Sequence, residues 1–439
     1  MQNDNILLAQ LNPIVADIEY NYNKALEFLE RAKKDNIKLV VYPELFLLGY
    51  PPIDIIERYP LIVEENIKYL EKFAQQCSDI AVLIGFCEFN NSSKGKKYYN
   101  SVAYIKNCKI EKIMRKSLLP VYSEFSEGRY FESAPFDSQN RIIEFNNQKV
   151  GVVICEENWN DDTFFKKPMY QFDPVKILVE EQKPDFIINL SASPTRAKKE
   201  QLLNNMLSHC AKKYSIPILY VNQTGSTDCI TFCGTSRAYD KNGELIARAK
   251  SFEEDYFVVV PYKSKTNRVE PLPKGVEKTL NSQKEFTLDY DWDMERSYLT
   301  ITNAIKDYFN KNGFERAVLG LSGGLDSSCC AYLLACAIGA KNVVGVSMPS
   351  KITSAQSKND AKELAQNLGI NFFEIPIKEM TDASKQTFDN VFEQIQQKWG
   401  EFRYSAPLTF DNIQARSRAM ILWGISNEFS STIPIATSD

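Results

Sequence analysis

Short apolar runs alternate with amphipathic segments from Ile6 to about Val260. The runs have the length of strands and are apolar at successive positions, as in a sheet that is covered on both faces. The segments at 21–34 and 60–76 instead repeat apolar residues at helical spacing. This alternation predicts an α/β domain with covering layers. Its predicted strands are 38–42, 80–85, 150–154, 186–190 and 216–221.

A second α/β series follows a stretch of different character. Residues 263–291 contain Pro271, Pro273 and Gly275 with mixed charge and little apolar periodicity, which indicates a linker. We therefore expect domains at 1–262 and 292–439. In the second domain, helices and strands alternate, which predicts a doubly wound parallel sheet that binds ligands at the carboxyl ends of its strands. The predicted elements are helix 294–312, strand 317–321, a helix ending at 338, strand 343–347, helix 354–368, strand 372–375 and strand 433–437.

The composition favours small molecules as ligands. A chain of 439 residues is long enough for two domains, and its net charge of −4 argues against a nucleic-acid partner held by a basic surface. The sequence shows neither a signal peptide nor a run of transmembrane length, so no membrane partner is expected. The ten cysteines are scattered without a CxxC motif, which is typical of a reducing compartment and predicts a cytoplasmic protein.

The chain has a single histidine, His209, within a stretch of helical spacing. We interpret it as an ordinary helix residue, either on the surface or in the core. One histidine excludes a zinc site built from several histidines. A nucleophilic mechanism must therefore use another kind of base, unless His209 itself is that base.

Glu44, Lys116 and Cys155 lie at or just beyond the ends of strand-like runs, where a sheet can hold side chains rigidly. Taken singly, they are more often a solvated carboxylate, a surface amine and a buried thiol. Together they have complementary chemistry. A free thiol is weakly ionised at neutral pH, so a carboxylate that accepts its proton and a cation that favours the anion both speed attack on an amide carbon.

The segments around these three residues resemble the signature segments of the nitrilase superfamily, in the same order. They read Tyr-Pro-Glu44-Leu-Phe, Arg-Lys116-Ser-Leu-Leu-Pro and Val-Ile-Cys155-Glu-Glu-Asn-Trp. The resemblance implies an αββα sandwich in which Glu44 is the base, Lys116 stabilises the tetrahedral oxyanion and Cys155 is the nucleophile. It further implies that Glu127 is an auxiliary carboxylate.

The glutaminase branch of that superfamily holds glutamine with a tyrosine, a serine and a basic residue. The matching positions here are Tyr122, Ser193 in Asn-Leu-Ser-Ala-Ser-Pro, and Lys199. The stretch between the serine and the lysine departs from the family pattern, so Arg196 is an alternative to Lys199. The resemblance thus implies L-glutamine as the amide substrate.

Ser322-Gly-Gly-Leu-Asp-Ser-Ser328 lies between a predicted strand and a predicted helix, where free N–H groups can face an anion. An isolated motif of this kind could be only a glycine turn with a helix cap. The full motif resembles the PP-loop pyrophosphatases, which split ATP into AMP and pyrophosphate. It lacks the lysine of a Walker loop. The resemblance implies Mg²⁺ at Asp326 and ATP at Gly320, Leu321, Ser322, Gly323, Gly324, Leu325, Asp326, Ser327 and Thr437.

Two later segments, 348–361 and 408–418, look like those of NAD synthetases, in which Asn412 and Arg416 would approach the dinucleotide. An amphipathic helix with exposed charges is the alternative. In that family the chain continues past the last strand into a Thr-Gly-Asn-Lys-Ser-Glu segment. We therefore expect that this sequence is truncated, or that its tail is not included, and that a metal-binding glutamate is missing.

Over its whole length, the sequence is similar to the glutamine-dependent NAD synthetases. The expected function is the ATP-dependent amidation of deamido-NAD with ammonia from L-glutamine, which gives NAD, AMP, pyrophosphate and glutamate, in a homo-oligomer. Three alternatives remain at this point. They are another PP-loop amidotransferase, an amidase whose C-terminal half only binds nucleotide or assembles the oligomer, and a nucleotide-binding scaffold without activity.

Overall fold

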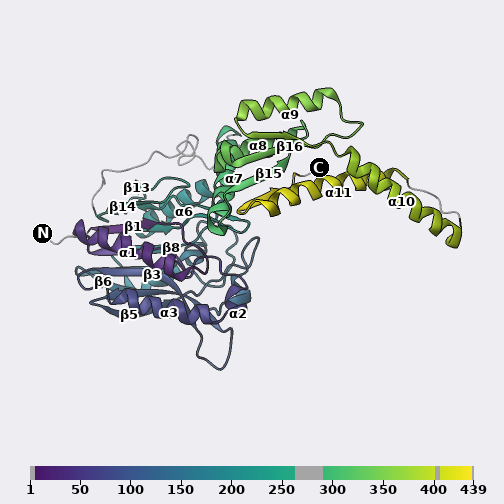
Figure 1. Cartoon of the computed structure of the whole chain (residues 1–439). Coiled ribbons are helices and arrows are strands. Elements are labelled where there is room, and N and C mark those ends of the chain that lie inside the picture. The colour runs from purple at the N-terminus through teal and green to yellow at the C-terminus, as the bar shows by residue number, and fades with distance from the viewer. Residues whose placement is uncertain (1–4, 263–289, 401–405, 438–439) are drawn as a thin grey trace. The chain divides into compact units, whose positions relative to one another are not determined.

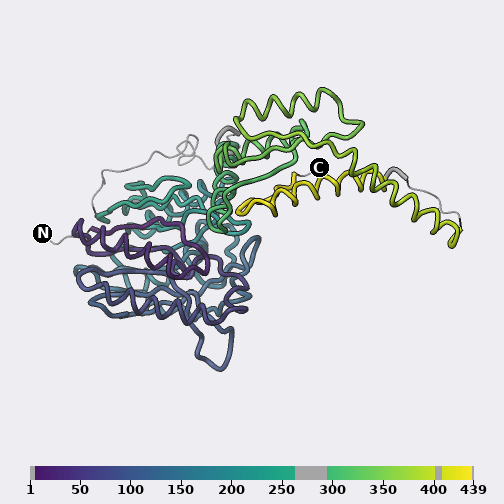
Figure 2. The backbone as a smooth tube through the Cα atoms, in the orientation of Figure 1, coloured from purple at the N-terminus to yellow at the C-terminus, as the bar shows by residue number. Residues whose placement is uncertain are grey.

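The computed structural model describes residues 5–262, 290–400 and 406–437. The chain forms two compact units, Met1–Thr300 and Ile301–Asp439, whose backbone is traced in Figures 1 and 2. Most of the predicted linker at 263–291 lies outside the described residues. Its last two positions already belong to helix α7, which begins at Tyr290.

Two mixed six-stranded sheets form the first unit, and the central strands of each are parallel. In spatial order, the first sheet contains β14 (Asp255–Val259), β1 (Ile6–Gln10), β2 (Leu39–Val41), β3 (Ala81–Phe89), β4 (Tyr98–Lys106) and β5 (Lys109–Arg115). The second contains β13 (Leu245–Arg248), β12 (Arg237–Tyr239), β9 (Ile218–Asn222), β8 (Phe186–Ser191), β7 (Gln148–Ile154) and β6 (Ile142–Phe145). A separate hairpin joins β10 (Thr224–Thr227) to β11 (Ile230–Cys233).

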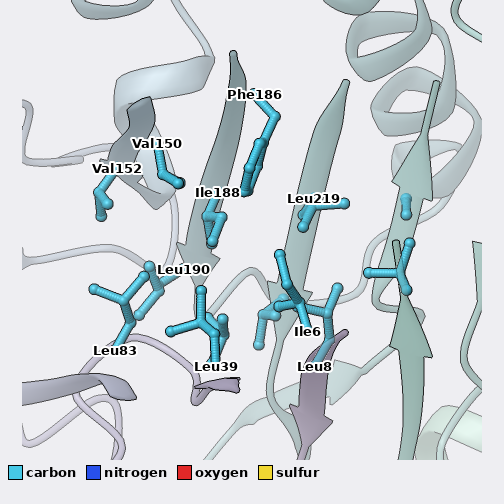
Figure 3. Close-up of a cluster of buried hydrophobic side chains, with 14 of the residues drawn as sticks. Ile6, Leu8, Leu39, Leu83, Val150, Val152, Phe186, Ile188, Leu190 and Leu219 are labelled. Carbon is cyan, nitrogen blue, oxygen red and sulfur yellow. The ribbon is translucent and has the colours of Figure 1, made fainter. Parts of the chain in front are cut away.

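The inner faces of the two sheets meet in a core of buried hydrophobic side chains. Figure 3 shows this contact between Ile6, Leu8, Leu39 and Leu83 of the first sheet and Val150, Val152, Phe186, Ile188, Leu190 and Leu219 of the second. Complete burial of one such side chain is worth about 1.5–3 kcal/mol, so the interface holds both sheets firmly in place. The strand ends that carry the site therefore rest on a rigid base.

Helices cover the outer faces of both sheets, because the strands are apolar on both sides. Helices α1 (Ile18–Lys34) and α3 (Leu61–Ala74) pack on the first sheet, and α5 (Pro174–Gln182) and α6 (Lys199–Tyr214) pack on the second. The short helices α2 (Ile55–Arg58) and α4 (Glu127–Tyr130) lie in connecting segments. These layers confirm the predicted αββα sandwich.

The second unit contains a parallel sheet in the order β17 (Asn371–Glu374), β16 (Val343–Ser347), β15 (Arg316–Gly320) and β18 (Thr432–Ile435). One face packs against α7 (Tyr290–Asn312), α8 (Leu325–Ile338) and α9 (Ala355–Leu368). The other face packs against α11 (Ala406–Glu428), which is preceded by α10 (Lys378–Trp399). The predicted doubly wound arrangement is confirmed. The predicted strands and helices are present in both units, and only their ends differ, by a few residues.

Candidate active site

Cys155 follows the last residue of β7 and opens a short 3-10 turn, Cys155–Asn158. Its φ of 44° lies in the left-handed region, which a residue with a side chain rarely adopts and which stores strain at functional sites. The backbone N–H donates to Oδ1 of Asn189 at 3.0 Å. The turn thus fixes a thiol that is only 3% exposed at the end of a central strand.

Glu44 and Lys116 form a fully buried ion pair in the same neighbourhood. The Nζ atom of Lys116 donates to Oε1 of Glu44 at 2.6 Å and to both carboxylate oxygens of Glu127 at 2.8 and 2.9 Å. Glu44 also accepts from Nδ2 of Asn100 at 2.7 Å and from the N–H of Ala192 at 2.8 Å. The structure therefore brings together the predicted base, the predicted cation and Glu127, the expected auxiliary carboxylate.

The electrostatics of this group keep the resting thiol neutral. Burial raises the pKa of Cys155, Glu44 adds to the rise, and Lys116 offsets part of it. Burial alone would lower the pKa of Lys116, but Glu127 and Glu44 outweigh it, so the amine stays protonated. Burial raises the pKa of Glu127 to about 7. A neutral thiol needs a base to become nucleophilic, and Glu44 is a buried carboxylate beside it.

A third buried carboxylate, that of Glu157, ties together the chain segments that carry Lys116 and Cys155. Glu157 accepts from the N–H of Ile154 at 2.8 Å and from the N–H and hydroxyl of Ser117 at 2.7 and 2.6 Å. Arg141 pairs with it through two bonds of 2.8 and 2.7 Å. Ile154 precedes Cys155 and Ser117 follows Lys116, so this one carboxylate fixes the neighbours of both functional residues.

A cavity of about 440 Å³ opens beside Cys155. Such a volume is typical of sites for small molecules. The three residues predicted to bind glutamine all reach the cavity wall. It is lined by Tyr122, Phe125, Cys155, Glu156, Trp159, Phe165, Lys167, Met169, Ser193, Arg196, Ala197, Lys198, Lys199 and Leu202.

Arg196 and Lys199 differ in what they contact. The guanidinium of Arg196 forms a two-bond ion pair with Glu124, with Nε at 2.8 Å from Oε1. The ammonium of Lys199 lies 5.6 Å from the ring centres of both Phe125 and Trp159. Among the described residues, no carboxylate lies within ion-pair distance of Lys199. The geometry therefore favours Lys199 over Arg196 as the cation available to a ligand.

Glu156 was not singled out in the sequence, although it directly follows Cys155. Its side chain is buried and still reaches the cavity wall. The hydroxyl of Tyr122 lies 3.1 Å from each of its oxygens, and that of Tyr170 lies 3.0 Å from Oε1. Its position next to the nucleophile was the one feature of the sequence that indicated a role for it. That feature is weak, because an acidic residue in a turn is usually solvated.

In the second unit, the loop between β15 and α8 has the geometry expected of an anion cradle. Gly323 has a φ of +83°, and a Cβ atom there would lie 2.2 Å from the carbonyl oxygen of Ser357. The hydroxyl of Ser322 accepts from the N–H of Gly324 at 3.2 Å and lies 3.0 Å from the hydroxyl of Ser327. The loop thus has a fixed, close-packed backbone at the N-terminus of α8.

The other residues predicted for the second unit lie on separate elements. Thr437 follows β18, which is parallel to β15, so it shares the sheet edge that carries the loop. Asn412 and Arg416 are exposed on α11, and Nη1 of Arg416 donates to Oδ1 of Asn412 at 2.8 Å. Asp326 is exposed in the first turn of α8. Mg²⁺ is usually bound by one or two carboxylates together with phosphate oxygens of a substrate, so a single exposed carboxylate is suited to it.

His209 is a residue of α6, as expected, and contacts a different set of groups. Its Nε2 atom lies 3.0 Å from the hydroxyl of Thr163 and 3.6 Å from Oδ2 of Asp161. It is not among the residues that line the cavity. Within the described ranges, no group of three or more potential metal-ligating acids, cysteines or histidines is present.

Comparison with known proteins assigns a family to each half of the chain. The carbon-nitrogen hydrolase family model matches residues 6–261, and the NAD synthase model matches residues 297–439. Relatives called glutamine-dependent NAD(+) synthetase, from Synechocystis sp. and Thermotoga maritima, are each 35% identical over 97% of this chain and 72% of their own length.

A solved structure has a similar fold over nearly the whole chain. It is the glutamine-dependent NAD+ synthetase of Acinetobacter baumannii in complex with ADP, with a TM-score of 0.80 and 29% identity. The similarity covers 99% of this chain and 74% of that one. In the described part of the chain, no helix combines the length and apolarity needed to cross a membrane.

Proposed function

Because the chain belongs to the glutamine-dependent NAD(+) synthetases, we propose that it makes NAD from deamido-NAD with ammonia released from L-glutamine. ATP drives the reaction and leaves as AMP and pyrophosphate, while glutamine leaves as glutamate. The observation that carries the proposal is the buried group of Glu44 and Lys116 beside Cys155, in a chain whose second half matches the NAD synthase family. That match disfavours an amidase whose C-terminal half only assembles an oligomer.

In the first unit, the reaction begins with removal of the thiol proton of Cys155 by Glu44. The thiolate sulfur attacks the side-chain carbonyl carbon of glutamine, and the Lys116 ammonium stabilises the oxyanion. The carbon–nitrogen bond then breaks, the nitrogen takes the proton from Glu44, and ammonia leaves. Water hydrolyses the resulting thioester. The pKa of the thiol, raised by burial, supports this order, because the thiol must be deprotonated within the complex.

Tyr122, Ser193 and Lys199 hold glutamine in the cavity beside Cys155. All three line that cavity, and Lys199 supplies the positive charge for the α-carboxylate. Lys199 takes this role rather than Arg196, because Arg196 is engaged by Glu124.

In the second unit, the loop that begins at Ser322 and ends at Ser327 binds ATP, together with Gly320, Leu321 and Thr437. Asn412 and Arg416 on α11 approach deamido-NAD. Asp326 holds Mg²⁺, which would neutralise phosphate charge. The support is the close backbone approach at Gly323 and the position of the loop at the amino end of a 14-residue helix.

The same proposal includes assembly and location. We place the enzyme in the cytoplasm, because its ten cysteines are typical of a reducing compartment. We expect a homo-oligomer. Light scattering of the purified protein measures the assembly directly, and a strictly monomeric enzyme would contradict this part of the proposal.

The test is to separate the two half-reactions in the full-length enzyme. Cys155→Ala should abolish ammonia release from glutamine and glutamine-driven NAD formation, because no thioester can form. With ammonium salt as the nitrogen source, the same variant should still form NAD. Equal loss of glutamine-driven and ammonium-driven turnover in a folded variant would contradict the assignment of Cys155 to the first half-reaction.

A further inference from the structure

Glu156 stands apart from the other buried glutamates in the described part of the chain. Glutamates 44, 88, 127, 157 and 200 each form an ion pair with a lysine or an arginine. For Glu156, which is 3% exposed, no lysine or arginine lies within ion-pair distance among the described residues. A buried carboxylate without a cation is costly unless another group compensates it.

Two tyrosines hold the Glu156 carboxylate without filling its hydrogen-bonding capacity. The hydroxyls of Tyr122 and Tyr170 contribute one proton each, whereas a carboxylate has about four acceptor positions. Burial raises the pKa of Glu156, and Lys116, both tyrosines and Lys199 offset part of that rise. The carboxylate therefore keeps open acceptor positions at the wall of the cavity.

The same cavity carries a complementary cation. Lys199 is packed between the rings of Phe125 and Trp159, and desolvation lowers its pKa. Among the described residues, Glu156 is the one carboxylate on the cavity wall, and of the three lysines there (167, 198 and 199) Lys199 is the one that lies over aromatic rings; neither Glu156 nor Lys199 is ion-paired with a described residue. A ligand with both charges on one carbon atom would satisfy both groups at once.

We propose that Glu156 binds the α-ammonium group of glutamine and, with Lys199 on the α-carboxylate, restricts the site to amides of α-amino acids. This inference rests on the proposed function and adds the residue that determines specificity. Simple amides would reach Cys155 but leave both charges without a partner. Discrimination against them follows, because a site built to bind a polar group rejects an analogue that lacks it.

The experiment measures ammonia release by the full-length enzyme from three amides. They are glutamine, glutaramate, which lacks the α-ammonium group, and 4-aminobutanamide, which lacks the α-carboxylate. Glu156→Gln should lower kcat/KM for glutamine by about 10- to 100-fold, as expected for loss of a hydrogen bond to a charged group, and mostly through KM. It should change kcat/KM for glutaramate little, so the ratio between the two substrates falls.

Lys199→Met gives the reciprocal result. It should lower kcat/KM for glutamine and glutaramate together and change the value for 4-aminobutanamide little. Equal losses on all three amides in the Glu156 variant would overturn the proposal, because Glu156 would then act only on the acidity of the Cys155 thiol. Failure of the unmodified enzyme to release ammonia from glutamine would instead refute the proposed function itself.

A milder variant keeps the test decisive if Glu156→Gln does not fold. Tyr170→Phe removes one hydroxyl that holds the carboxylate, so it should lower the ratio of glutamine to glutaramate in the same direction. Tyr214→Phe is the matched control, because the Tyr214 hydroxyl lacks a hydrogen-bond partner among the described residues and is not on the cavity wall. An unchanged ratio in Tyr170→Phe would overturn the proposal.

Discussion

Replacing Lys116 with methionine should damage the glutaminase site in two separable ways. The side chain is fully buried, and its ammonium is the charge that Glu44 and Glu127 share. Removing one partner of such a pair leaves an uncompensated buried charge and costs about 3–5 kcal/mol of stability. Loss of the group that stabilises the oxyanion should also lower the rate of glutamine hydrolysis by about 100- to 1,000-fold.

The stability loss in this variant should depend on pH. Burial already raises the pKa of Glu127 to about 7 with Lys116 present, and removal of the cation raises it further. A carboxyl group with a folded pKa above its unfolded value of about 4.3 stabilises the fold at low pH, and this contribution disappears as pH rises through the folded pKa. The unmodified protein loses the same contribution between about pH 4 and pH 7, so the deficit of the variant relative to it should stay nearly constant in that range and grow above about pH 7.

Calorimetric unfolding at several pH values measures this deficit. Because the chain has two compact units, the transition of the first unit has to be followed separately. A Lys116→Met/Glu127→Gln double variant should regain part of the stability at high pH, because one of the two crowded carboxylates is gone. It should not regain hydrolysis. A pH-independent deficit, or a near-normal hydrolysis rate in Lys116→Met, would refute the reasoning.

Three further predictions concern single residues. Glu44→Gln should slow both glutamine hydrolysis and iodoacetamide alkylation of Cys155, because the thiol loses its base; normal rates of both would remove Glu44 from the site. Gly323→Ala should weaken ATP binding, measured by titration calorimetry, by about tenfold or more, because left-handed strain adds to the clash with Ser357. Although burial alone would raise it, the pKa of Glu200 is lowered to about 2 by three arginines, so its contribution to stability should disappear as pH falls from about 4 to 2. The free energy of unfolding of Glu200→Gln should therefore fall less between about pH 4 and pH 2 than that of the unmodified protein, and an equal fall in both proteins would contradict the prediction.

Sequence patterns predicted the layers of both units because strands and helices differ in period and length. Successive apolar positions at 150–154 and 186–190 indicated strands covered on both faces, and the structure places helices on the outside of that sheet. The ends of elements were less predictable. The strand predicted at 433–437 runs from Thr432 to Ile435, because hydrogen bonding to β15, not hydrophobicity, decides where the strand stops.

The choice between Arg196 and Lys199 could not be made from the sequence, because both residues are basic and both lie near the same turn. The structure separates them through a third residue, Glu124, which lies far from them in the chain and engages only the arginine. The role of Glu156 could not be predicted from the sequence for the same reason. An acidic residue next to a nucleophile is identified as unpaired only when the fold shows that each neighbouring cation is engaged elsewhere or out of reach. Spacing along the chain gives the identity of candidate groups, whereas charge neutralisation across the fold decides which of them is left to meet a ligand.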